Sequence, residues 1–96
     1  MDVQGTNHGG NRRGAMGAAL RRTTREFVEL VGLEPESVTA VDRVDGGWRF
    51  RLEVEEMERI PPTTSVLASY EVTADRKGEI LGFRRVRRYL RSQTEG

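Results

Sequence analysis

Two glutamates on one predicted strand, Glu53 and Glu55, are the groups whose spacing could support acid–base chemistry. Side chains two residues apart in a strand project from the same face, about 7 Å from each other. Paired carboxylates at such a spacing can act on a glycosidic bond. An exposed sheet face, however, provides no desolvation to separate their two pKa values. We therefore expect a solvated strand face here rather than a catalytic pair.

The sequence offers no other group that could complete a catalytic or metal site. It contains no cysteine, and its one histidine, His8, lies in a Gly/Asn-rich stretch without other ligands nearby. The N-terminal glycines follow no predicted strand and lack the Gly-Lys-Ser/Thr element of a phosphate-binding loop. No histidine base accompanies the serines in an ordered segment. The sequence thus predicts a protein that is not an enzyme and that binds no metal, cofactor or small-molecule substrate.

Charges of opposite sign are segregated along the chain. Residues 53–58 hold four glutamates and no basic side chain. Residues 84–91 hold five arginines and no acid: Arg84, Arg85, Arg87, Arg88 and Arg91. In a meander the third strand would separate the two blocks by roughly 10 Å, and its Glu71 alone is a poor match for five positive charges. We therefore expect the basic block to need a partner from outside the fold.

The faces of this last strand present a further conflict. Strict alternation would place arginines on both faces, which a strand buried on one side does not accommodate. Either a β-bulge switches the faces, or the strand end projects beyond the helix that covers the sheet. Three interpretations stay open: a solvated edge strand whose charge opposes aggregation, a docking surface for an acidic protein, or a nucleic-acid site. The last is considered because arginines interleaved with aromatic side chains such as Tyr89 also hold single strands.

A short proline-containing loop adjoins the acidic block. Its sequence from Glu58 to Thr64, Glu-Arg-Ile-Pro-Pro-Thr-Thr, places an isoleucine at the tip of a rigid connection. Such a loop either only joins two strands or is preorganised for docking. The predicted partner-binding residues come from the loop, its acidic neighbour and the basic block: Glu56, Arg59, Ile60, Pro61, Arg84, Arg85, Arg87, Arg88 and Tyr89.

One helix comes before the segments that carry these groups. From about Gly14 to Val31, side chains recur at the three- and four-residue steps of a helix face. They are Met16, Leu20, Thr23, Phe27, Leu30 and Val31. Gly32 suits a left-handed cap after the last of them, and Pro35 prevents the helix from continuing.

The remaining chain reads as four strands, at residues 37–44, 48–57, 65–73 and 79–90. Asp45-Gly46-Gly47 predicts a hairpin after the first of them. Trp48 opens the second strand on its inward face, where we expect it to anchor the core, with an interface hot spot as the alternative. The sequence thus predicts an α+β domain in which one N-terminal amphipathic helix packs on a curled four-stranded antiparallel meander.

A chain of 96 residues provides for a single domain. We expect a disordered N-terminal tail over 1–13, one α+β domain over 14–91 and a C-terminal tail over 92–96. The net charge of +1 gives little support for nonspecific nucleic-acid binding. No export signal follows Arg12-Arg13, and no stretch approaches the ~20 apolar residues that span a bilayer. We therefore expect a cytoplasmic protein without membrane contact.

Several motifs between Ser37 and Leu90 carry a family resemblance. They are Asp45-Gly46-Gly47-Trp48; Glu56-Met57-Glu58-Arg59-Ile60-Pro61 followed by Thr63-Thr64; Val66-Leu67-Ala68-Ser69-Tyr70-Glu71-Val72; Gly78-Glu79-Ile80-Leu81-Gly82-Phe83; and Arg84-Arg85-Val86-Arg87-Arg88-Tyr89. In this order the motifs resemble the gas vesicle protein O family. The chain departs from the family at Pro62, where an acidic residue is expected, and at Phe83, where tyrosine is frequent.

The resemblance implies a non-enzymatic accessory role in the assembly of gas vesicles, the protein-shelled, gas-filled buoyancy organelles of some microorganisms. It implies that the protein acts by binding other accessory or shell proteins, in the cytoplasm and in association with the vesicles. It supplies no binding site, so the site residues above rest on the charge pattern. Two alternatives stay open, a nucleic-acid-binding regulator of gas vesicle gene expression and a minor component attached to the shell.

Overall fold

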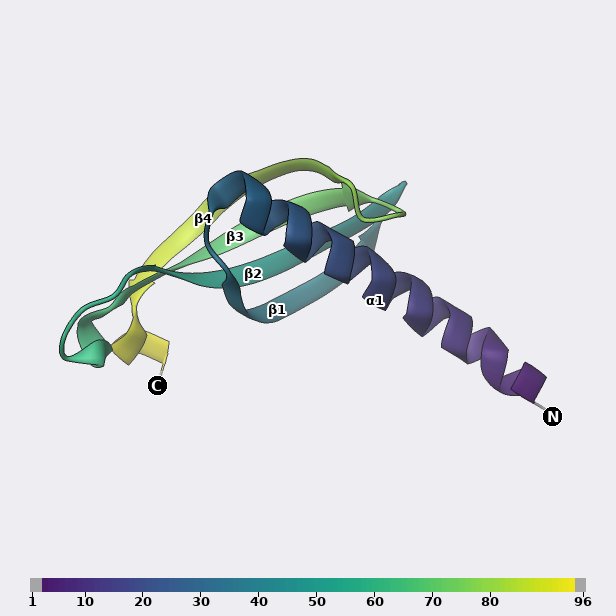
Figure 1. Cartoon of the computed structure of the whole chain (residues 1–96), viewed down its shortest axis with the longest axis horizontal. Coiled ribbons are helices and arrows are strands. Elements are labelled where there is room, and N and C mark those ends of the chain that lie inside the picture. The colour runs from purple at the N-terminus through teal and green to yellow at the C-terminus, as the bar shows by residue number, and fades with distance from the viewer. Residues whose placement is uncertain (1–2, 95–96) are drawn as a thin grey trace.

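One helix and one four-stranded sheet make up the fold (Figure 1). The computed structural model describes residues 3–94, with side chains from residue 14 to residue 93. The elements are α1 (Val3–Val31), β1 (Pro35–Val44), β2 (Gly47–Met57), the 3-10 helix η1 (Pro62–Thr64), β3 (Val66–Asp75), β4 (Ile80–Leu90) and the 3-10 helix η2 (Arg91–Thr94). All neighbouring strands are antiparallel, in the order β1-β2-β3-β4. The predicted α+β meander under a single helix is confirmed.

The helix begins earlier than the sequence pattern indicates. We expected it from Gly14, but the backbone is helical from Val3, so α1 includes residues that we assigned to a tail. The His8 side chain, residues 1–2 and residues 95–96 lie outside the described part of the chain. At the other end, η2 occupies Arg91–Thr94, where we expected the C-terminal tail to begin. The division into one domain and two tails stays a prediction.

The core lies between α1 and one face of the sheet. Ala19, Thr23 and Phe27 recur at four-residue steps and are at most 1% exposed. The sheet contributes the fully buried Phe50, Leu52, Val54, Ala68, Val72 and Ala74. The prediction that Leu30 lies on the buried face is wrong, since its side chain is 61% exposed. The buried side chains of the helix follow four-residue steps, and Leu30 does not lie on that line.

Trp48 anchors the end of this core nearest the β1–β2 hairpin. Its ring stacks on Phe50 at a centroid distance of 6.3 Å, and its Nε1–H donates to the carbonyl of Arg76 at 3.2 Å. Arg43 covers the ring from outside, 5.9 Å from its centroid. The indole thus finds apolar contact and a hydrogen-bond partner within the fold, as expected for a core anchor.

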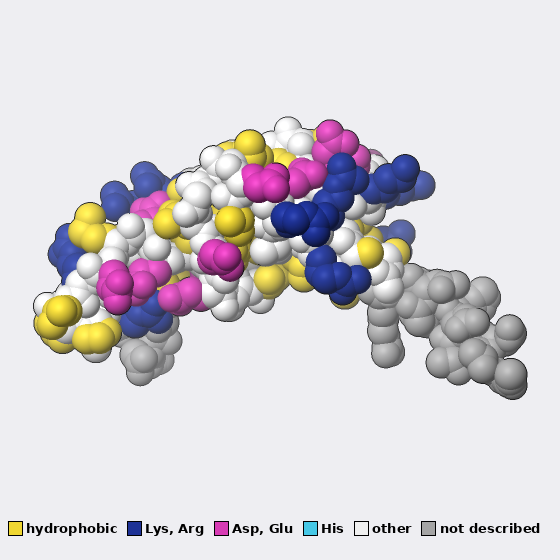
Figure 2. All heavy atoms as spheres, viewed as in Figure 1, with side chains coloured by type: hydrophobic (Ala, Val, Ile, Leu, Met, Phe, Trp, Pro, Cys, Tyr) yellow, Lys and Arg dark blue, Asp and Glu magenta, His cyan; other side chains and the backbone are white. Residues whose placement is uncertain are grey.

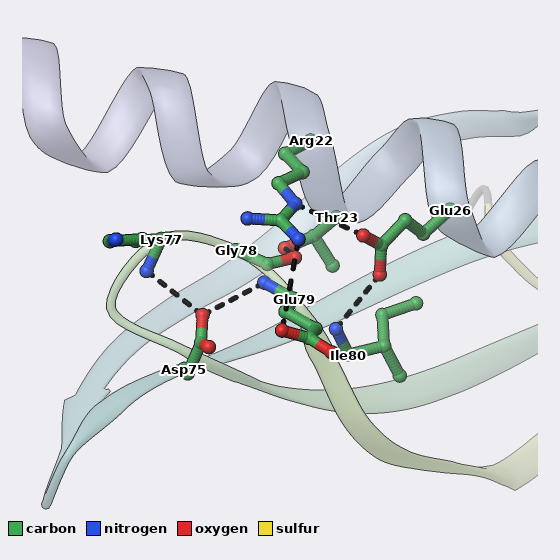
Figure 3. A network of polar contacts seen from close by, with 8 residues as sticks. All are labelled: Arg22, Thr23, Glu26, Asp75, Lys77, Gly78, Glu79 and Ile80. Carbon is green, nitrogen blue, oxygen red and sulfur yellow. Dashed lines mark hydrogen bonds and ion pairs between the residues drawn. The ribbon is translucent and has the colours of Figure 1, made fainter.

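A hydroxyl and a glycine fasten α1 to the turn between β3 and β4 (Figure 3). The buried Thr23 hydroxyl donates to the carbonyl oxygen of Gly78 at 2.8 Å. Gly78 has a φ of +97°, and a Cβ at this position would lie 2.4 Å from the carbonyl oxygen of Ala19. The helix backbone therefore rests directly on the turn, and only glycine leaves room for that approach.

Carboxylates fix both sides of the same junction (Figure 3). Glu26 accepts the backbone N–H of Ile80 at 3.0 Å and the Nε–H of Arg22 at 3.0 Å. The hydrogen bond from Ile80 is the main cause that lowers the pKa of the Glu26 carboxyl. Asp75 accepts the N–H groups of Lys77 and Glu79 within the turn, each at 2.9 Å. The helix and the turn are thus joined by bonds to backbone as well as by packing.

Candidate functional site

The end of the sheet opposite the Trp48 hairpin projects beyond the last turn of α1 (Figure 1). This distal end consists of η1 with its flanking loop, the facing ends of β2, β3 and β4, and η2. Hydrophobic side chains gather at its tip, next to acidic and basic ones, on the face seen in Figure 2. Most of the predicted partner-binding residues belong to these segments, but Arg84 and Arg85 lie midway along β4, where they pair with Glu71 and Tyr70 of β3. Most of the set is engaged within the fold.

A β-bulge in β4 distributes the arginines between the two faces. Ser69 pairs with Arg87 whereas Tyr70 pairs with Arg85, so Val86 is one extra residue on β4. Arg85 and Arg88 consequently share the face that α1 covers further along, and Arg84 and Arg87 share the opposite, helix-free face. Of the two solutions that we predicted, a bulge and a projecting strand end, the structure contains both.

Glu56 is the centre of a cluster on the helix side of the distal end. Its carboxylate meets Arg85 at 3.3 Å and Arg88 at 3.1 Å, and it accepts the hydroxyl of Tyr70 at 2.9 Å. Glu56 continues the alternation of Leu52 and Val54, which face α1, and lies at a register shift between Glu55 and Met57. The Glu56 side chain is only 13% exposed and holds two arginines in place, while its part in partner binding stays a prediction. Burial, followed by the bond to Glu56, raises the pKa of Tyr70.

Glu53 lies on the opposite face at the centre of a second cluster. Its carboxylate accepts hydroxyl hydrogens from Ser69 at 2.5 Å, from Thr39 at 2.6 Å and from Tyr89 at 2.6 Å. The residue is 7% exposed, so the expected solvated position is wrong. Burial raises the pKa of this carboxyl, but the three hydroxyl bonds outweigh it and hold the pKa below its ordinary value.

The protonation and contacts of Glu53 and Glu55, the two glutamates considered for acid–base chemistry, do not suit that role. Glu53 is held ionised by three donors, and Glu55 accepts a bond from Arg91 at 3.0 Å. A general acid would need a raised pKa and a proton to give, and Glu53 has neither. In the described part of the chain, no group of three or more His, Cys, Asp or Glu residues could hold a metal ion.

Tyr89 joins the buried carboxylate to the surface. Burial, and then its hydrogen bond to Glu53, raises the pKa of the Tyr89 hydroxyl to about 12. Arg87 lies over the ring, with its guanidinium carbon 4.4 Å from the centroid. The phenol is thus fixed at both its hydroxyl and its face, and the Arg87 side chain is held in one direction on the helix-free face.

The basic block is neutralised more fully than we expected. Glu71 receives Arg84 at 3.2 Å, and Arg91 binds Glu36 at 2.6 Å and Glu55 at 3.0 Å. With the two pairs at Glu56, four of the five arginines meet carboxylates, so the expectation of unmatched charge is wrong for them. Their acids come from β1, β2 and β3. Arg87 has no carboxylate within ion-pair distance among the described residues and keeps only its contact with Tyr89.

The loop between β2 and β3 is held by its own polar groups. The N–H of Arg59 donates to the hydroxyl of the buried Ser65 at 2.9 Å. Both the N–H and the hydroxyl of Thr64 donate to the carbonyl of Pro61, at 2.9 and 2.7 Å. Ile60 stands at the tip with 95% of its surface exposed. The loop is thus held by internal hydrogen bonds and exposes an apolar side chain, and both interpretations, a plain connection and a preorganised docking loop, stay open.

The sequence did not predict the groups that surround the carboxylates of Glu53 and Glu56. Thr39, Ser69 and Tyr70 were not predicted to take part in a polar cluster, although Ser69 is directly opposite Glu53 in the β2–β3 register. The pairing of a serine with a glutamate on adjacent strands could have indicated this hydrogen bond. Also, no helix in the described part of the chain combines the length and apolar character needed to cross a membrane.

Comparison with known proteins gives consistent results. Residues 3–95 match the family described as gas vesicle synthesis protein GvpO. A gas vesicle protein O from Streptomyces sp. is 47% identical over 76 residues, which cover 79% of this chain and 59% of that protein. Gas vesicle protein O1 from Halobacterium salinarum is 34% identical over 73 residues, or 76% of this chain and 61% of that protein. Gas vesicle protein O from Haloferax mediterranei is 33% identical over 64 residues, or 66% and 46%.

The chain thus spans about half to three fifths of the length of these relatives. No solved structure shows significant similarity to it.

Proposed function

Because the chain belongs to the gas vesicle synthesis protein GvpO family, we propose that it is a non-enzymatic accessory protein of gas vesicle assembly. It acts by binding other gas vesicle proteins, either accessory or shell proteins, in the cytoplasm at the vesicles. The binding surface is the distal end of the sheet together with the adjoining middle part of β4, and its contact residues are Ile60, Pro61, Arg84, Arg87 and Arg88.

The main support for this binding surface is that its groups are already held in place within the fold. Ile60 is 95% exposed on a loop whose backbone is already bonded, and Arg87 is fixed over Tyr89. Groups that are held in place before binding lose little conformational entropy when a partner arrives. Arg84 adds a side chain that remains 73% exposed despite its ion pair. An apolar tip beside fixed cations suits a protein partner with an apolar pocket and acidic neighbours.

The alternative, a nucleic-acid-binding regulator, has less support. Base stacking requires free aromatic faces. Of the aromatic residues in and next to the basic block, Tyr89 is covered by Arg87, and Phe83 packs edge-on against Phe27 at 5.9 Å. Four of the five arginines are also paired with carboxylates, which reduces their attraction for phosphates.

Co-purification from cells that make vesicles tests the proposal. A tagged double variant, Ile60→Glu with Arg87→Glu, alters the distal end without breaking any of its carboxylate–arginine pairs. The control is Arg76→Glu, which repeats the arginine reversal at the opposite end of the sheet, in the turn after β3. We expect the double variant to lose the vesicle proteins that the native chain and the control retain, while all three unfold at similar urea concentrations. Undiminished capture by the double variant would remove this surface from consideration.

A further inference from the structure

Strand β4 forms one of the two edges of the sheet, and this edge suggests how a partner binds. β4 contains 11 residues and no proline, and it is the last strand in the sheet order. We infer that β4 receives an extended, acidic segment of a partner protein as a fifth strand. This inference rests on the proposed function and specifies how the partner is held: by main-chain hydrogen bonds along the edge, with side chains giving specificity.

Side-chain caps mark both ends of the free edge. The N–H of Leu90 donates to the side-chain oxygen of Gln93 at 2.7 Å, and the N–H of Ile80 donates to Glu26 at 3.0 Å. Between these caps, no described group outside β3 bonds the backbone of β4. An uncapped edge of this length can take about eight residues of a partner strand, at ~3.3 Å per residue.

The direction of single N–H groups follows from the ladder. Arg91 donates its N–H inward, to the carbonyl of Ser65 at 2.9 Å, whereas the N–H of Leu90 reaches the outer cap. N–H groups alternate in direction along an antiparallel strand. Arg88, two residues before Leu90 and on the same side of the bulge, therefore directs its N–H to the open edge. This group is the part of the edge that a single substitution can remove.

Apolar side chains lie exposed along the same edge. Leu81 is 66% exposed, Phe83 41% and Val86 36%. On α1, Leu30 is 61% exposed one turn beyond Phe27, whose ring contacts Phe83. A strand laid beside β4 would cover these side chains with its own, which is the usual gain from cross-strand pairs. An edge protected only by charge would not need them.

The positive charge of β4 indicates that the partner segment is acidic. The five arginines all lie in or directly after β4. The carboxylates that four of them meet lie on β1, β2 or β3, at least one strand spacing of ~4.8 Å farther from the edge. Arg87 meets no carboxylate among the described residues, and Arg84 stays 73% exposed despite its ion pair, so acidic side chains of an added strand find cations on the helix-free face. A second copy cannot pair through its own β4, because five arginines would then oppose five others. The occupant is therefore an acidic segment of another protein.

Synthetic peptides of ten residues test the inference in solution. The probe alternates glutamate and valine, a second peptide alternates lysine and valine, and a third is the glutamate peptide with N-methyl groups on alternate backbone nitrogens. We expect fluorescence anisotropy to show binding of the first, none of the second, and at least tenfold weaker binding of the third. Equal binding of the first and third peptides would overturn the inference, because it would show that main-chain bonds are not used. Absence of binding by the first peptide would overturn it as well.

A matched pair of variants locates the edge. Arg88→Pro removes the outward N–H and the guanidinium, while Arg88→Ala removes the guanidinium alone. We expect the glutamate peptide to bind Arg88→Pro at least tenfold more weakly than Arg88→Ala. Equal affinity for two folded variants contradicts strand addition. A native chain whose mass in light scattering rises with concentration, and falls to one copy in Arg88→Pro, would show that a second copy occupies the edge and also overturn the inference.

The same pair of variants separates this inference from the proposed function. If Arg88→Pro and Arg88→Ala capture vesicle proteins equally from cells, while Ile60→Glu with Arg87→Glu captures none, then the accessory role stands and strand addition is wrong. If none of the variants affects capture, the distal surface fails together with its binding mode.

Discussion

The contact between Gly78 and the helix makes a quantitative prediction about stability. In Gly78→Ala, the new methyl group would lie 2.4 Å from the carbonyl oxygen of Ala19 and 2.9 Å from its Cα. Backbone atoms of a helix cannot rotate away as a flexible side chain can. The turn and α1 must therefore separate, and the hydrogen bond from Thr23 to the Gly78 carbonyl lengthens or breaks.

The cost has two parts. An alanine at the φ of +97° adds conformational strain of about 1–2 kcal/mol. The steric conflict resembles overpacking of a core and adds about 1–3 kcal/mol. Gly46 provides the control, because its φ is +80° and a Cβ there meets nothing within 4 Å. Gly46→Ala should therefore show the strain alone, and the difference between the two variants, about 1–3 kcal/mol, measures how tightly the helix rests on the turn.

Urea unfolding followed by the fluorescence of Trp48, the only tryptophan, provides the assay. For a domain of this size, the expected difference corresponds to a lowering of the melting temperature by roughly 4–8 °C per kcal/mol. If Gly78→Ala is no less stable than Gly46→Ala, the close approach of α1 to the β3–β4 turn is refuted, since the steric part of the cost would then be absent.

Three further predictions concern the polar groups. Thr23→Val should lower the free energy of unfolding by about 1–3 kcal/mol because a buried carbonyl loses its donor; Thr23→Ser keeps a hydroxyl, and a loss as large as that of valine would contradict this cause. Tyr89→Phe should cost about 1.5–3 kcal/mol at pH 7, as expected for a bond to a charged group. Because the folded-state pKa of Tyr89 is raised from 10.0 to about 12, the free energy of unfolding should fall as the pH rises between these values, and the fall should be smaller in Tyr89→Phe. The carboxyl of Glu53 has a folded pKa below 4.5, so its contribution is complete above that pH and is lost on acidification through its folded pKa; Glu53→Gln should be less stable at neutral pH but lose less in acid, and parallel acid titrations of both proteins would refute this assignment.

The fold could be predicted because its signals are local. Alternation from Trp48 to Val54 fixes the buried face of β2, and Gly46 with Gly47 fixes the hairpin before it. The start of α1 was missed because the glycine-rich residues before Gly14 have low helix propensity and no apolar period. Leu30 was misplaced because three- and four-residue steps define a broad stripe, of which the sheet covers only a part.

The polar clusters could not be predicted because they depend on register. Thr39 reaches Glu53 at a register shift between Val38 and Ala40, and the bulge in β4 puts Arg88 on the same face as Arg85 and Glu56. A bulge changes which face every later residue occupies, and nothing in the sequence of β4 indicates that Val86 is the extra residue. Charge segregation indicated where the arginines and glutamates concentrate, but it could not show that Glu56 and Glu71 pair with three of the five arginines.

The hydroxyls around Glu53 also select the alignment of the strands. Tyr89 faces this carboxylate only because the single additional residue at Val86 shifts the end of β4 by one position. An alignment without that shift would turn the phenol to the other side of the sheet and leave a buried anion short of a donor, at a cost of about 1–3 kcal/mol or more. Apolar area alone discriminates weakly between such alignments in a chain that is 35% hydrophobic. The correct pairing of β4 with β3 is therefore specified by the matching of polar groups, on a face of the sheet that no helix covers.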